Sequence, residues 1–144
     1  MYEISFKNLA KIILDKIYVL ALMLGILVQF AWHMLLGSEI PTVITNKEFY
    51  SFTIFSIVLL LLTLLYLKFQ NVNSLKRTIK LSLILLYVTF FTYLWVMGLI
   101  DTFAYPRHKY LVLSRYSGFA TTLLIILYCI WKIFRSKNRN PLNI

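Results

Sequence analysis

The sequence predicts an all-α integral membrane protein with four transmembrane helices, and two observations support this fold class. First, 60% of the 144 residues are apolar or aromatic, whereas about 45–50% is usual in soluble domains. Second, four runs match the roughly 20 apolar residues that a helix needs to cross a hydrocarbon core about 30 Å thick. A soluble fold of this size would leave such long runs facing water, so we place them in lipid.

The predicted spans contain no Asp, Glu or Arg and are residues 17–36, 51–69, 81–100 and 118–134. The first run is longer than the 7–15 apolar residues of a signal peptide, and no small-residue cleavage site follows it, which indicates an uncleaved helix. Residues 1–16 place apolar side chains at helical spacing and predict a cytoplasmic interfacial amphipathic segment. The transmembrane domain is then 17–135, followed by a polar cytoplasmic tail at 136–144.

Charge asymmetry predicts the orientation. Of the 15 Lys and Arg residues, eleven lie before the first span, between the second and third spans, or around the end of the fourth. The four on the other side are Lys47, Arg107, Lys109 and Arg115. Because Lys and Arg in short loops resist translocation, we expect both termini in the cytoplasm. Short connections favour an up-down-up-down bundle. In a bacterium this would be a multi-pass protein of the inner membrane.

Composition also limits the ligands. A net charge of +10 would indicate nucleic acid in a soluble protein. Here the cations flank apolar runs, where they fix topology and meet anionic lipid headgroups, so we expect membrane lipids as partners and no nucleic acid. Cys129 is the only cysteine, and His33 and His108 are the only histidines. We therefore expect no cofactor and no metal site, with a single-haem or carboxylate-assisted site as the alternative.

A polar stripe is predicted on the first helix. Ala21, Gly25, Gln29 and His33 follow one another at four-residue intervals, so we expect them on one face. Small residues allow close helix approach, and polar ones can hydrogen-bond across the contact. We interpret the stripe as helix packing; the alternative is a path for a substrate or proton.

Hydroxyl side chains repeat at seven-residue intervals in the second and third spans. They are Ser56 and Thr63, and Ser82 and Thr89. A hydroxyl in lipid can bond to its own helix backbone, so we interpret these four as packing residues.

A second candidate site lies between the third and fourth spans, where cations and aromatic residues are dense. We predict anion or partner binding by Asp101, Tyr105, Arg107, His108, Lys109 and Arg115. Asp101 could orient His108 as an acid/base pair, or the segment is only an interfacial loop anchored by tyrosines. Residues 110–116 alternate in polarity, so the segment is either a strand or, with Pro106 at the helix start, part of a long fourth helix.

These features favour a non-catalytic protein that binds another integral membrane protein, as an accessory subunit, an assembly factor or an immunity protein. The alternative is a small transporter or channel made of several copies of the chain and lined by Gln29, His33, Thr63 and Thr89. An enzyme acting on lipid-linked substrates through Asp101, Arg107 and His108 is a weaker alternative, because no nucleophile or metal set accompanies these residues.

Overall fold

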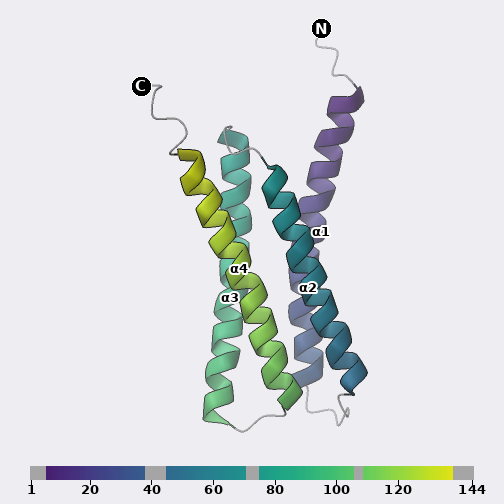
Figure 1. Cartoon of the computed structure of the whole chain (residues 1–144), viewed down its shortest axis with the longest axis vertical. Helices are drawn as coiled ribbons and strands as arrows, with labels where there is room; N and C mark the ends of the chain where they lie inside the picture. The colour runs from purple at the N-terminus through teal and green to yellow at the C-terminus, as the bar shows by residue number, and fades with distance from the viewer. Residues whose placement is uncertain (1–5, 38–44, 71–74, 106–108, 138–144) are drawn as a thin grey trace.

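The fold consists of four long α-helices (Figure 1). The computed structural model describes residues 6–37, 45–70, 75–105 and 109–137. The helices are α1 (Phe6–Gly37), α2 (Asn46–Phe69), α3 (Leu75–Ala104) and α4 (Lys109–Lys137). Each contains a segment long and apolar enough to cross a membrane. The all-helical class and the four potential membrane-spanning helices are thereby confirmed.

The helices are longer than the predicted spans. α3 has 30 residues, which at 1.5 Å per residue is about 45 Å, the thickness of a bilayer with its headgroup regions. The predicted spans covered only the hydrocarbon part of that length. α4 begins at Lys109 rather than at Gly118, so the strand alternative for residues 110–116 is wrong; Pro106 lies outside the described residues. In a helix the backbone satisfies its own hydrogen bonds, whereas a strand here would need a partner strand.

α2 has a well-defined start. The hydroxyl of Thr45 accepts a hydrogen bond from the backbone N–H of Glu48 at 3.4 Å, and the backbone N–H of Thr45 donates to the Glu48 carboxylate at 2.8 Å. This reciprocal capping box satisfies two N–H groups that the first helical turn leaves without partners.

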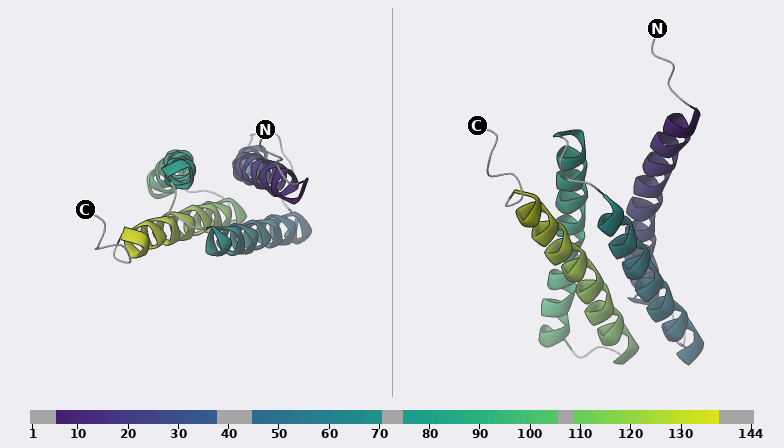
Figure 2. Two further views of the ribbon diagram at one scale, coloured as in Figure 1. Left: turned by 90° about the horizontal axis from the view of Figure 1, so that it is seen from above. Right: turned by 45° about the horizontal axis from the view of Figure 1, so that its top comes forward.

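Neighbouring helices in the chain run in opposite directions (Figure 1). α1 and α3 begin, and α2 and α4 end, at one end of the bundle, which we call the terminal end. Seen from above, α1 and α3 lie in one row and α2 and α4 in the other (Figure 2). α4 contacts all three other helices, most extensively α3, while α1 and α3 contact each other least among the pairs that touch.

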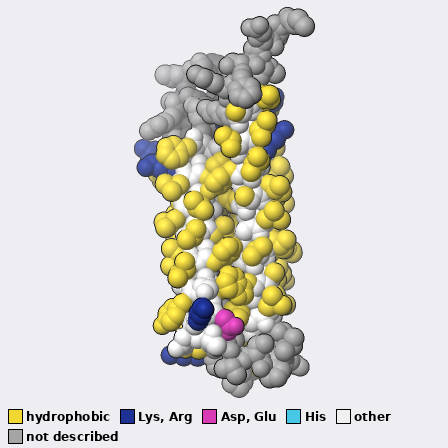
Figure 3. Space-filling model, turned by 90° about the vertical axis from the view of Figure 1, so that its right-hand side faces the viewer, with side chains coloured by type: hydrophobic (Ala, Val, Ile, Leu, Met, Phe, Trp, Pro, Cys, Tyr) yellow, Lys and Arg dark blue, Asp and Glu magenta, His cyan; other side chains and the backbone are white. Residues whose placement is uncertain are grey.

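The buried core is narrow, since only 22% to 28% of the most apolar window of each helix is buried within the chain. Core side chains come from every helix and include Leu22, Ile26, Leu59, Leu67, Leu81, Ile84, Val88, Phe91, Ile125 and Cys129. Further apolar side chains pack partly against this core, and many others are exposed. On the face shown in Figure 3 they cover the middle of the molecule, and Lys and Arg lie toward its two ends. This distribution is what a surface in contact with lipid requires.

Candidate functional site

Two residues of the predicted stripe, Gln29 and His33, bind side chains of other helices inside the bundle. The Gln29 amide nitrogen donates to the Ser56 hydroxyl of α2 at 2.8 Å, and His33 Nδ1 lies 2.8 Å from the Ser114 hydroxyl of α4. Both α1 side chains are buried. They therefore join α1 to two neighbours by interhelical hydrogen bonds, as the packing interpretation expects.

The other two residues of the stripe lie elsewhere. Ala21 is exposed, and Gly25 faces α2, where an added Cβ would lie 2.7 Å from Leu59 Cδ1. A four-residue step turns a helix by 40° more than a full turn, so residues twelve positions apart differ by about 120°. The predicted stripe thus winds around α1 and does not stay on one face.

The hydroxyl residues separate into two groups. Ser56 and Thr63 are buried, whereas Ser82 and Thr89 are exposed. The hydroxyls of Ser56, Thr63 and Thr89 each donate to the carbonyl four residues earlier in their own helix. Thr89 therefore lies on the outside of the chain, whereas Gln29 and His33 lie in its interior.

Part of the predicted outer cluster lies within helices. Arg115, on α4 and only 9% exposed, pairs with Asp101 of α3 at 3.0 Å. The Arg115 guanidinium also donates to the Gly98 carbonyl at 2.5 Å and to the Thr102 hydroxyl at 2.6 Å. This cation joins α3 to α4.

Two of the remaining members of that cluster lie within the described residues and two lie outside them. Tyr105 and Lys109 are exposed. Arg107 and His108 lie outside the described residues, so the acid/base pair of Asp101 with His108 stays a prediction. Arg115 is one partner that the structure gives Asp101.

A third polar cluster, at the terminal end, was not predicted as a site. The Lys80 ammonium of α3 lies 2.7 and 2.8 Å from the two carboxylate oxygens of Asp15 on α1. Tyr66 of α2 and Gln70, which caps the end of that helix, donate to the same carboxylate at 2.6 and 2.8 Å. The Lys80 ammonium also donates to the Tyr66 hydroxyl and to the Gln70 side-chain oxygen. Tyr18 stacks on Tyr66 with ring centroids 4.2 Å apart. We call Asp15, Tyr66, Gln70 and Lys80 the terminal network.

The terminal network could have been suspected from the sequence. Asp15 lies at the start of the first apolar run, while Gln70 and Lys80 flank the connection between the second and third. Alternating helix directions bring these positions to the same end of a bundle. Asp15 is also the only acidic residue near the predicted inner boundary, and a carboxylate at such a depth needs a cationic partner.

Among the described residues, no group of three or more His, Cys, Asp or Glu side chains is arranged to hold a metal ion.

Three buried polar atoms near the middle and far end of the bundle have no hydrogen-bond partner: Gln29 Oε1, Trp95 Nε1 and Arg115 Nε. The His33 ring lies 4.9 Å from that of Trp95, centroid to centroid. Buried polar side chains thus come from α1, α2 and α4, and Gln29, His33 and Arg115 each bond to another helix. Comparison with protein-family models, curated proteins and solved structures gave no match for this chain.

Proposed function

We propose that this protein is a non-catalytic, multi-pass membrane protein that binds another integral membrane protein, as an accessory subunit, an assembly factor or an immunity protein. In this proposal the bundle spans the membrane up-down-up-down with both termini in the cytoplasm, in the inner membrane if the cell is bacterial. One observation carries the proposal: among the described residues, Gln29, His33, Asp101 and Arg115 are bonded to other helices of the chain, and the exposed lateral surface is rich in large apolar side chains.

The internal bonds favour binding over transport or catalysis. Gln29, His33 and Arg115 each bond to another helix, while Gln29 Oε1 and Arg115 Nε have no partner within the described part of the chain. A transport path needs polar groups that face a continuous space, and an enzyme needs a nucleophile or acid/base group that a substrate can reach. Buried side chains engaged with their neighbours are poorly placed for either role.

The outward face of α1 is the contact surface that we propose. Apolar residues recur on it at alternating steps of three and four, and all are exposed: Leu14, Ile17, Ala21, Leu24, Val28, Ala31 and Leu35. We call this row the α1 seam. Such spacing forms the contact line of packed helix pairs, and its two alanines allow another backbone to approach closely, which favours association in lipid. Ala21 keeps its predicted packing role, directed outward, whereas Gly25 serves the contact with α2.

The proposal is tested by substituting both alanines of the seam. Tagged wild-type chain, purified from its native membranes in mild detergent, should carry a second polypeptide at constant stoichiometry by mass spectrometry. The double variant Ala21→Phe and Ala31→Phe should retain that polypeptide about tenfold less well, a loss of roughly 1.4 kcal/mol of binding free energy. Ala120→Phe is the matched control, because Ala120 is exposed on α4.

Two outcomes would contradict the proposal in different ways. Equal retention of the partner by the double variant and by wild type would exclude the α1 seam as the contact surface. A purified particle that contains only copies of this chain would exclude the foreign partner and favour the oligomeric transporter.

A further inference from the structure

A lateral groove runs between α1 and α3, beginning at the terminal network. Its first part, of about 240 Å³, is lined by Asp15, Lys16, Val19, Leu20, Met23 and Lys80. Its second part, of about 620 Å³, is lined by Met23, Leu83, Leu86, Tyr87 and Phe90. Met23 belongs to both parts, so they form one groove from the end of the bundle toward its middle.

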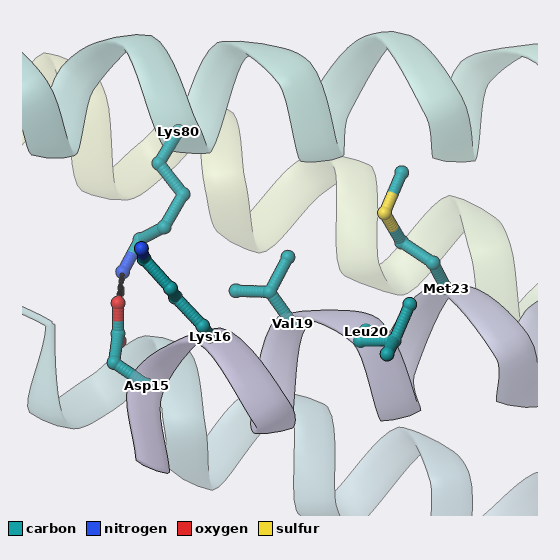
Figure 4. A pocket seen from close by; sticks show the side chains of 6 residues that line it. All are labelled: Asp15, Lys16, Val19, Leu20, Met23 and Lys80. Atoms are coloured by element: carbon teal, nitrogen blue, oxygen red, sulfur yellow. Dashed lines mark hydrogen bonds and ion pairs between the residues drawn. The ribbon is translucent and has the colours of Figure 1, made fainter. Parts of the chain in front are cut away.

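Each wall of the groove is one stripe of a helix. On α1 the lining residues Lys16, Val19, Leu20 and Met23 are spaced by three or four, and the same spacing relates Leu83, Leu86, Tyr87 and Phe90 on α3. Figure 4 shows Lys16, Val19 and Met23 extending from α1 toward α3. From Lys80 to Phe90 the groove rises about 15 Å, which is half of a hydrocarbon core about 30 Å thick. The groove is therefore as long as one leaflet is deep.

Polarity changes along the groove. Charged side chains lie only at its terminal end, where the Asp15–Lys80 ion pair closes it (Figure 4). The Lys80 ammonium is engaged by Asp15, Tyr66 and Gln70 and neutralises a carboxylate that would repel an anion. The exposed Lys16 is then the cation at the entrance. Further in, the Tyr87 hydroxyl donates to the Met23 carbonyl at 2.7 Å, so this wall presents apolar surface only.

We propose that the groove binds an anionic phospholipid from the leaflet at the terminal end, with its phosphate at Lys16 and one acyl chain along Met23, Leu83 and Leu86. The groove has a cation at the headgroup level and an apolar part as long as one leaflet is deep. It therefore complements such a lipid in both charge and length. A transmembrane helix fits less well, because the Asp15–Lys80 pair and the Tyr87–Met23 bond both cross the gap that it would have to enter. This site lies on a different face from the α1 seam and does not depend on a protein partner.

Headgroup selectivity gives the first test. The purified chain is mixed with equal amounts of phosphatidylglycerol and phosphatidylcholine of identical acyl chains, and bound lipid is counted by native mass spectrometry. We expect phosphatidylglycerol to be retained about fivefold over phosphatidylcholine, the effect of roughly one cation at a membrane surface. Lys16→Ala should reduce the ratio to about one. Lys68→Ala should leave it unchanged, since Lys68 is an exposed lysine at the same end, outside the groove. An equal loss in both variants, or no selectivity in wild type, would overturn the proposal.

Photo-crosslinking in native membranes gives the second test and separates a lipid from a protein occupant. A benzophenone side chain in place of Leu86 should form adducts enriched in anionic phospholipid, and Lys16→Ala should remove the enrichment. The control position is Val58, exposed on α2 a similar number of residues from the terminal end, where adducts should reflect the bulk lipid composition. A polypeptide adduct at Leu86, or the same lipid composition at both positions, would refute the lipid site.

Discussion

The α3–α4 pair and the α1–α3 pair differ in how extensively their helices contact each other. Between α3 and α4 the Trp95 ring packs directly on Gly118, so that a Cβ on Gly118 would lie 2.4 Å from the ring. α1 packs closely on α2 at Gly25, where a Cβ would lie 2.7 Å from Leu59 Cδ1, but the lipid-sized groove lies between α1 and α3.

This difference has a consequence for function. Helices in lipid gain no hydrophobic driving force from meeting each other, so close packing and hydrogen bonds decide which contacts last. We infer that α3 and α4 are the rigid part of the bundle. α1, whose outer face and groove remain available, is the part that other molecules contact.

The largest expected effect comes from filling the close contact between α3 and α4. Gly118→Ala places a methyl group within the Trp95 ring, and overpacking of this kind costs about 1–3 kcal/mol of the free energy of unfolding. Gly98→Ala is the matched control, because the nearest side-chain atom to its new Cβ, Arg115 Nε, would be 3.5 Å away. Unfolding in detergent by increasing denaturant should show a large loss for the first variant and none for the second. Equal stabilities would contradict the close packing.

The terminal network should have an intermediate effect. Asp15→Ala and Lys80→Ala, alone and together, form a double-mutant cycle that measures their coupling. The Asp15 side chain is 34% exposed and the Lys80 side chain 20%. We therefore expect a coupling near 1 kcal/mol, a value between those of exposed ion pairs and of fully buried ones. The same unfolding assay applies. A coupling indistinguishable from zero would mean that the ion pair does not hold α1 to α3.

The smallest effect is expected from the polar bonds in the middle of the bundle. A cycle of Gln29→Leu and Ser56→Ala should show a coupling of about 0.6 kcal/mol, as typical hydrogen bonds between membrane helices do. Thr89→Val serves as the control and should leave stability unchanged, because Thr89 is exposed and bonds only within its own helix. A Gln29–Ser56 coupling above that of the terminal network would reverse our ranking of the contacts that hold α1.

The candidate sites were predictable only in part. Gln29 and His33 were singled out as polar residues of the first helix, and both form hydrogen bonds to other helices. Their partners, Ser56 and Ser114, lie 27 and 81 positions away and could not be paired from spacing alone. Arg115 was assigned to a loop because the spans were drawn by hydropathy, which does not detect the turns of helix that extend into the headgroup region.

The number of helices and their apolar character were determined by the sequence itself, because a segment in lipid must satisfy its own backbone hydrogen bonds and this is a local property. Which face of each helix is buried was decided by tertiary structure. α2 is apolar on nearly every side, and apart from Ser56 and Thr63 its sequence contains little that indicates which side is buried. The terminal network and the groove likewise exist only because packing brings α1, α2 and α3 together, and no single segment of the chain contains enough information to predict them.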